Sequence, residues 1–214
     1  MSRFLLVIFV LFKSYLDLEG QVQKVKKYFE DNKLVMLIVI SSLAIGVVLG
    51  ALMATRVSPE EGEALCLSVN QSIAKTGVYA SFLKALSLEF KSFLILFVCG
   101  IAIIGSPAAA FYIGTKGYAV GFTVAFFMRY YGLMGLLASL GGVLPHYIVL
   151  IPAFMCMGVV GINFSNKLLL GEKNLKDNLK IYIAKSVLIA IFVLFGCAVE
   201  GFVSSPILKM ILSI

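Results

Sequence analysis

The sequence predicts an all-α, polytopic integral membrane protein with about five transmembrane helices, some of them kinked or broken. Only 14% of its 214 residues are charged, whereas a soluble domain carries roughly 25%, and its mean hydropathy is +1.03. Most of the chain lies in apolar stretches that reach or approach the roughly 20 residues needed to cross a bilayer. These stretches are 34–54, 92–113, 117–140, 144–162 and 181–202.

Basic residues indicate the orientation, because Lys and Arg collect on cytoplasmic loops. They precede the first stretch and separate the last two, at Arg3, Lys13, Lys24, Lys26, Lys27, Lys33, Lys167, Lys173, Lys176 and Lys180. This pattern predicts a cytoplasmic N-terminus and, after five crossings, an external C-terminus. The same pattern explains the net charge of +7. We therefore expect membrane lipid to be a partner of the protein and expect no binding to nucleic acid.

Three parts of the chain follow from this topology. Residues 1–33 form an N-terminal cytoplasmic or interfacial segment, and 34–214 a single membrane domain with an extracytoplasmic helical segment at 55–91. The apolar run 4–12 after Arg3 is open to three interpretations: an interfacial amphipathic helix, which we favour, an uncleaved short anchor, or residues upstream of the true start.

The sequence predicts no enzyme, metal or cofactor. His146 is the single histidine, so metal sites and catalytic triads that need several histidines cannot form. The four cysteines contain no C-x-x-C spacing. Asp17, Asp31 and Asp177 lie outside the apolar stretches, which argues against an intramembrane aspartyl protease.

Small residues and prolines predict where helices pack and bend. Gly46 and Gly50 recur at every fourth position, and Gly117 and Gly121 repeat that spacing. Such spacing lets helices approach closely, within the chain as the favoured interpretation or in a homo-oligomer. Kinks are expected at Pro107, Pro145, Pro152 and Pro206, with a break around 130–135.

The segment 55–91 predicts two amphipathic helices. Ser58 followed by Pro59 is typical of a helix start. The apolar residues of the two helices are candidates for partner binding or for burial against their own bundle. They are Leu65, Val69, Ile73, Tyr79, Phe82 and Leu86.

Three ionisable residues fall within the apolar stretches, at Arg129, His146 and Glu200. Buried charges are costly in lipid and are functional candidates by default. Helix lengths place all three in the outer half of the membrane, where an Arg129–Glu200 pair could form with His146 nearby. Alternatively, Glu200 and His146 reach water at helix ends and Arg129 binds carbonyls freed by the break in the third stretch.

Several short motifs resemble the stage II sporulation protein M family, from about Lys24 onward. They are Gly-Tyr-Ala-Val-Gly-Phe at 117–122, Tyr131-Gly132, Leu144-Pro145-His146, Ile151-Pro152 and the segment 197–206 with Glu200 and Pro206. Broader relatives carry a glutamate shortly after the Pro-His pair, where this chain has Val149, Leu150 and Ile151, which favours the sporulation branch. The first 20 residues match nothing in the family.

The resemblance implies a non-enzymatic membrane scaffold for engulfment during endospore formation. Members of the family localise two peptidoglycan hydrolases, stage II sporulation proteins D and P, at the septal membrane of the bacterial cell. The alternative is a small permease or channel, since broken helices with an intramembrane Arg and Glu are typical of transporters.

Overall fold

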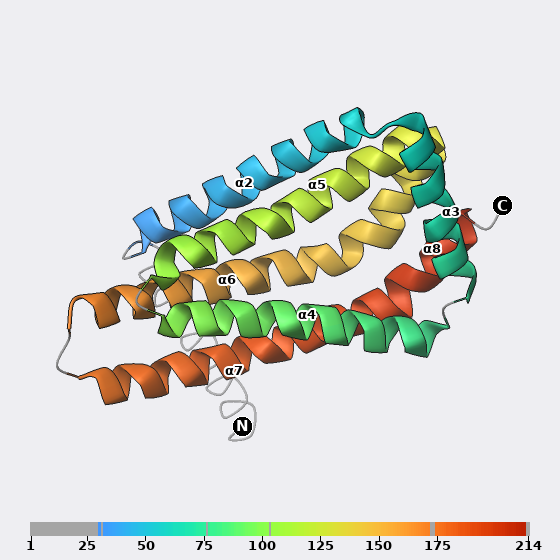
Figure 1. The fold of residues 1–214 in the computed structure, drawn as a ribbon. Coiled ribbons are helices and arrows are strands. Elements are labelled where there is room, and N and C mark those ends of the chain that lie inside the picture. The colour runs from blue at the N-terminus through green and yellow to red at the C-terminus, as the bar shows by residue number, and fades with distance from the viewer. Residues whose placement is uncertain (1–29, 31, 76, 103, 172–173, 213–214) are drawn as a thin grey trace, which may run out of the picture. The chain divides into compact units, whose positions relative to one another are not determined.

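The computed structural model describes residues 30, 32–75, 77–102, 104–171 and 174–212, which are almost entirely helical and contain no strand (Figure 1). The all-α prediction is confirmed. The elements are α2 (Lys33–Arg56), α3 (Pro59–Lys75), α4 (Val78–Ile101), α5 (Gly105–Ala138), the π-helical turn η1 (Ser139–Val143), α6 (Leu144–Leu169), α7 (Leu175–Val199), the π-helical turn η2 (Glu200–Ser204) and α8 (Ser205–Leu212). The chain forms two compact units, residues 1–37 and residues 38–214. All contacts described below lie within the second unit. The predicted helix at 4–12 lies outside the described residues.

Three helical stretches of the described chain are long and apolar enough to cross a membrane: Lys33–Arg56, Gly105–Leu169 and Leu175–Ile211. The second contains two passes, because the chain reverses at Gly132, whose φ of 56° and ψ of −133° are not helical. This confirms the predicted break around 130–135. After it, α6 runs back along α5 (Figure 1).

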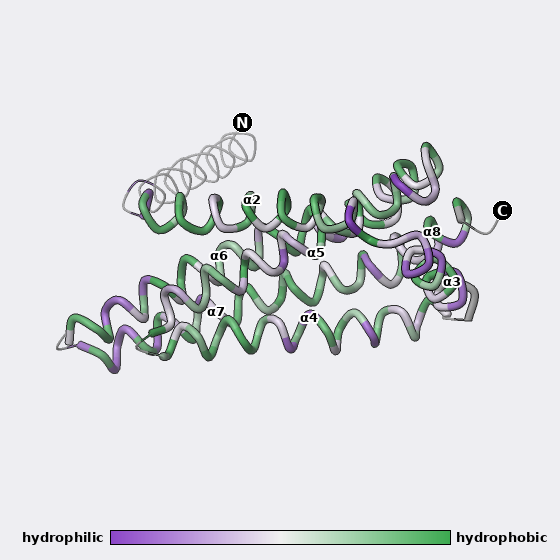
Figure 2. The backbone as a smooth tube through the Cα atoms, turned by 45° about the horizontal axis from the view of Figure 1, so that its top comes forward, coloured by the Kyte–Doolittle hydropathy of each residue, from purple (hydrophilic) through white to green (hydrophobic). Residues whose placement is uncertain are grey.

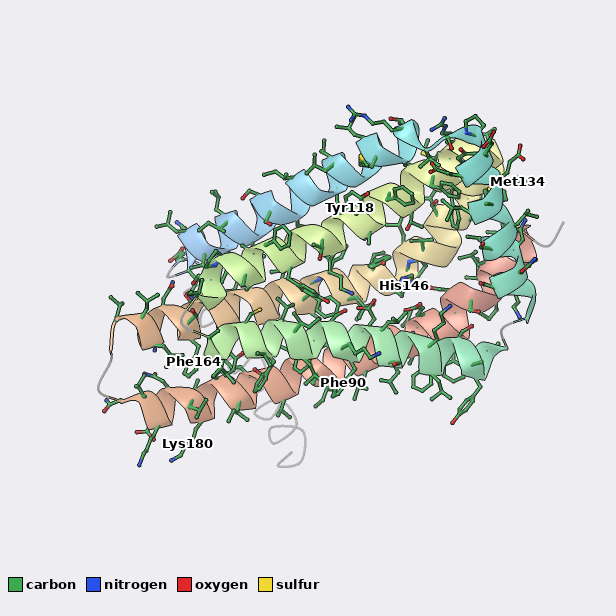
Figure 3. The ribbon with its side chains drawn as sticks, viewed as in Figure 1. Phe90, Tyr118, Met134, His146, Phe164 and Lys180 are labelled. Atoms are coloured by element: carbon green, nitrogen blue, oxygen red, sulfur yellow. The ribbon has the colours of Figure 1, made fainter. Side chains whose placement is uncertain are left out.

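Helix α4 is not one of these three stretches, although it is long enough to be a further pass. Its 24 residues are about 36 Å long at 1.5 Å per residue, and it packs along α6 and α7. Three charged residues, Lys84, Glu89 and Lys91, make it less apolar than α2, which is mostly hydrophobic in Figure 2. Met134 and Lys180 mark opposite ends of the helices (Figure 3).

The predicted boundaries of the second pass are wrong. The apolar stretch 92–113 is divided between two helices, because α4 ends at Ile101 and α5 begins at Gly105. Pro107 lies in the first turn of α5, where backbone N–H groups have no helical acceptor and proline is tolerated. It therefore marks a chain reversal instead of a kink, and residues 78–91 form the first half of α4.

The other prolines follow the same logic. Pro145 lies in the first turn of α6, directly after η1, and Pro206 lies near the start of α8, directly after η2. A proline cannot donate the i→i−4 hydrogen bond, and a π turn is one way for a helix to accommodate the lost bond. Pro152 alone lies inside a helix, α6.

Helices α2 and α5 meet through glycines. A Cβ atom on Gly46 or Gly50 would overlap the carbonyl oxygen of Gly114 or Tyr118 on α5. Gly117 and Gly121 lie equally close to carbonyl oxygens of α2. The small-residue pattern on both helices therefore forms a contact within one chain, which we call the glycine seam. At its end, Ala54 is fully buried beside Phe126 and Phe127.

Candidate functional site: a polar cavity above a buried ion pair

Arg129 lies at the end of the glycine seam where α2 ends. Its Nη1 atom donates to the carbonyl oxygens of Ala54 at 2.9 Å and Thr55 at 2.6 Å, and its guanidinium carbon lies 5.5 Å from the centre of the Tyr130 ring. The carbonyls in the last turn of a helix lack helical donors, so α2 offers acceptors at this point. Arg129 thus binds the end of α2, and the predicted pair with Glu200 is wrong.

His146 and Glu200 do lie close together, since both line one polar cavity. His146 is 8% exposed, and its Nδ1 atom lies 3.2 Å from the hydroxyl oxygen of Ser204. Its ring also packs on that of Tyr147, with centroids 4.3 Å apart. Figure 3 shows His146 on α6.

The polar cavity has a volume of about 290 Å³. Residues of α3, α4, α5, α6, α8 and both π turns line it, and most of them carry a hydroxyl, an imidazole or a charge. The lining residues are Ser72, Ser81, Lys84, Leu88, Thr123, Gly142, Val143, His146, Tyr147, Glu200, Ser204, Ser205 and Leu208. The cavity therefore brings polar side chains together at the end of the bundle that carries α3, within a lining surface that is mostly apolar.

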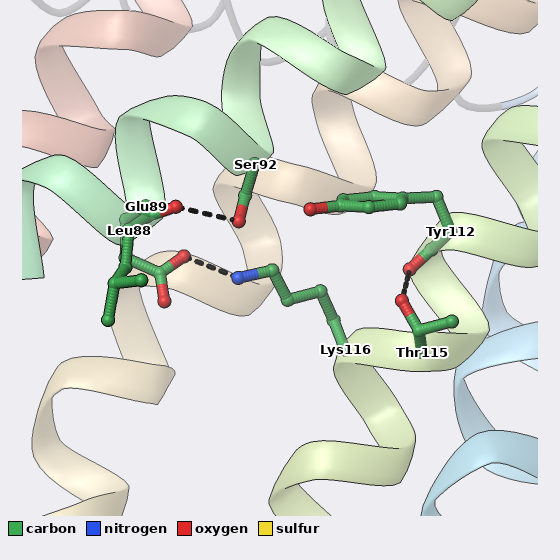
Figure 4. Close-up of polar contacts among 6 residues, drawn as sticks. All are labelled: Leu88, Glu89, Ser92, Tyr112, Thr115 and Lys116. Carbon is green, nitrogen blue, oxygen red and sulfur yellow. Dashed lines mark hydrogen bonds and ion pairs between the residues drawn. The ribbon is translucent and has the colours of Figure 1, made fainter.

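A buried ion pair lies deeper in the bundle (Figure 4). Lys116 of α5 places its Nζ atom 2.6 Å from the carboxylate of Glu89 on α4, with side chains only 15% and 11% exposed. The Nζ atom also lies 4.9 Å from the centre of the Phe154 ring on α6. The pair thus joins three helices.

Sequence reasoning missed this pair because it treated Glu89 and Lys116 as flanking the ends of apolar stretches. One signal could have found it. Glu89 lies 12 residues before the end of α4, and Lys116 lies 11 residues after the start of α5. In a helical hairpin that turns at 102–104, these offsets bring both residues to the same depth, about 17 Å from the turn at 1.5 Å per residue.

Helix α3 is fastened to the same end of the bundle. Ser58 and Glu61 exchange two hydrogen bonds of 3.3 Å between side chain and backbone, which is the capping box of a helix start. The hydroxyl of Tyr130 donates to the Ser58 carbonyl at 3.2 Å, and that of Tyr131 contacts the Asn70 side chain at 3.1 Å. Helix α3 also packs on α8, so its position is fixed.

The residues predicted to bind a partner take different positions. Leu65 and Tyr79 are exposed, at 40% and 69%. Val69 packs against the core cluster around Phe126, and the Phe82 ring lies 5.9 Å from that of Phe202. Leu86 is half-buried, and the side chain of Ile73 lies outside the described residues. The apolar face of α3 is therefore shared between the bundle and the surface.

Within the ranges that the structure describes, no group of three or more His, Cys, Asp or Glu side chains could hold a metal ion. The cysteines at 66, 99, 156 and 197 are free thiols. The expected absence of a cofactor and of catalysis stays a prediction.

Comparison with known proteins identifies the chain at the level of a family. The family model described as Stage II sporulation protein M matches residues 35–205, which extend from the third residue of α2 to the first residue of α8. No curated protein matches the chain, and no solved structure does. Together with its apolar helices, the match supports a sporulation-related membrane protein. The chain belongs to the stage II sporulation protein M family.

Proposed function

We propose that the protein is a non-enzymatic membrane scaffold for engulfment during endospore formation. It recruits and localises two peptidoglycan hydrolases, stage II sporulation proteins D and P, at the septal membrane. Family membership supports a role in sporulation, and the structural observation that carries the proposal is the rigidly held helix α3.

Helix α3 offers a preformed surface of mixed chemistry. Glu60, Glu61 and Glu63 are exposed, and so are Leu65 at 40% and Leu67 at 63%. The helix is mostly hydrophilic (Figure 2), so it is suited to water and not to the lipid core. Apolar side chains exposed among charges are typical of protein interaction sites. The lysine pattern predicts that this surface faces the cell wall, where wall hydrolases act.

The test replaces the exposed leucines of α3 while leaving its cap and tyrosine contacts intact. The double variant Leu65→Ser and Leu67→Ser should lose capture of proteins D and P in pull-downs from sporulating membranes. The matched control is Leu170→Ser, which changes a leucine that is 78% exposed at the opposite, lysine-rich end. Undiminished capture by the α3 variant, with membrane insertion unchanged, would contradict the proposal.

A small permease or channel is the second candidate, and the polar cavity above the Glu89–Lys116 pair favours it. Transport paths across a bilayer are commonly lined by ionisable groups that face the bundle interior. Flux measurements on the purified protein in liposomes separate the two functions. A permease should lose flux in Glu200→Gln and keep it in the α3 variant, whereas a scaffold should show no flux and lose recruitment in the α3 variant.

A further inference from the structure

We propose that the polar cavity binds a small zwitterion, whose ammonium group contacts Glu200 and whose phosphate or carboxylate contacts Lys84. The inference goes beyond the scaffold function and does not depend on it. It rests on the charges, the hydrogen bonds, the backbone and the size of the cavity.

Two opposite charges line the cavity without pairing. Lys84 comes from α4 and Glu200 from η2. No hydrogen bond or ion pair with another residue in the described ranges holds either side chain. A ligand with a positive and a negative end would give both groups charge-assisted hydrogen bonds, which are the strong ones.

The deeper ion pair makes this charge pattern selective. Glu89 is already neutralised by Lys116 at 2.6 Å, so it does not compete for the ligand. Lys84 and Glu200 then leave the cavity formally neutral with its charges separated. A simple cation would be attracted by Glu200 and repelled by Lys84, and a simple anion the reverse. A zwitterion can place each of its charges beside the residue of opposite charge.

Hydrogen bonds fasten the walls of the cavity to one another. The hydroxyl oxygens of Ser81 on α4 and Ser205 on α8 lie 2.9 Å apart. The bond between His146 and Ser204 joins α6 to η2 at 3.2 Å. A site whose walls are fixed in advance loses less entropy when a ligand binds. These contacts therefore favour a ligand site over an incidental packing gap.

Both π turns of the described chain open onto the cavity. Turn η1 contributes Gly142 and Val143, and η2 contributes Glu200 and Ser204. π turns inside helices are rare and are frequently found at functional sites. The extra residue of η2 changes the direction of the side chains around Glu200 relative to a regular α-helix. This is a second observation, independent of charge, that marks the same place.

The volume limits the ligand. At about 290 Å³, the cavity lies at the small end of ligand pockets, which span roughly 300–1,000 Å³. An amino acid, a dipeptide or a lipid headgroup fits this size. Phosphoethanolamine and amino acids share the required chemistry, and they differ in whether the ligand is free or is part of a lipid.

The test titrates the purified full-length protein in detergent with glycerophosphoethanolamine and with glycylglycine, by calorimetry. Ethanolamine supplies only positive charge, and glycerol 3-phosphate supplies only negative charge. We expect at least one zwitterion to bind about tenfold tighter than either ethanolamine or glycerol 3-phosphate. Glu200→Gln and Lys84→Met should each weaken binding of that zwitterion about ten- to a hundredfold. Lys91→Met is the matched control, since Lys91 is exposed on the same helix outside the cavity.

Native mass spectrometry then separates the two sources. Retention of phosphatidylethanolamine from nanodiscs, in preference to phosphatidylglycerol, identifies a lipid headgroup, whereas binding of the soluble zwitterion without lipid retention identifies a free ligand. Glu200→Asp and Lys84→Arg keep the charges and should keep binding, which controls for folding. Absence of zwitterion binding in all arms, or equal affinity in wild type, Glu200→Gln and Lys84→Met, would overturn the inference. No hydrolase is present, so the result is independent of recruitment.

Discussion

Helix α5 uses two adjacent faces in opposite ways. Gly117 presses against the Leu43 carbonyl of α2, while its neighbour Lys116 reaches to Glu89 of α4. In a bilayer, lipid is as apolar as the side chains, so helices are held by close packing and by polar contacts between them. Helix α5 uses close packing on one face and a polar contact on the adjacent face, at the same depth.

The two contacts should fail in different ways. The glycine seam has no room for an added side chain, but it holds few polar groups that a substitution could leave unpaired. The ion pair, in contrast, is sensitive to the loss of a charged partner. Removing one charge leaves the other buried, whereas removing both leaves a contact that apolar side chains can fill.

The largest effect is expected from breaking the ion pair on one side. Lys116→Met leaves the Glu89 carboxylate buried without its partner, and Glu89→Met does the same to Lys116. Each variant should lose about 3–5 kcal/mol of unfolding free energy, measured by denaturant unfolding in detergent micelles. The double variant Lys116→Met with Glu89→Met should recover most of that loss.

Additivity would count against this account. If the double variant is as unstable as the sum of the two single variants, the charges do not act as a pair. Lys180→Met with Asp177→Met is the matched control, because that pair lies 3.4 Å apart with side chains 79% and 75% exposed. An exposed pair contributes little, so these changes should leave stability nearly unchanged.

The glycine seam should show the next largest effect. Gly117→Leu and Gly50→Leu force side chains against backbone atoms that cannot move aside, and overpacking typically costs about 1–3 kcal/mol. The same unfolding assay measures it. Gly77→Ala, where an added Cβ meets nothing within 4 Å, should cost far less. Equal losses at both positions would mean that the seam is not close-packed.

Local signals in the sequence were sufficient for most of the fold. The helix start at Ser58 and the break at Gly132 each depend on a few neighbouring residues and were predicted at the right places. The turn between α4 and α5 was missed because the residues 102–104 are Ala, Ile and Ile. Hydropathy has no minimum there, so two helices were interpreted as one stretch.

That single error also concealed the site. With the turn misplaced, Glu89 and Lys116 seemed to lie outside the apolar stretches, and Arg129 and Glu200 remained as the obvious opposite charges. The true partners of Arg129 are backbone carbonyls of α2, which carry no sequence signal. The polar cavity depends on seven helical elements meeting, and periodicity along one helix cannot show such a meeting.

Substitution of Arg129 tests the end of the glycine seam where α2 ends. Arg129→Met removes both hydrogen bonds to the last carbonyls of α2, which can then bind water. Because the side chain is partly exposed, we expect a loss of about 1 kcal/mol, below the usual range for buried charged hydrogen bonds. Arg129→Lys should recover part of it. A loss as large as that of Lys116→Met would mean that this contact, too, is a buried charge.

The smallest effect concerns a polar contact that joins α2 to α5 near the opposite end of the seam. The Ser42 hydroxyl donates to the Ala110 carbonyl at 2.5 Å. Hydrogen bonds between membrane helices average about 0.6 kcal/mol, so Ser42→Ala should cost about that much. The adjacent Ser41 is the matched control, because it bonds within its own helix, to the Ile38 carbonyl at 3.0 Å, and Ser41→Ala should change stability less. If the two alanine variants are equally stable, close packing alone holds α2 to α5 at this depth, and the contrast between the two faces of α5 becomes sharper.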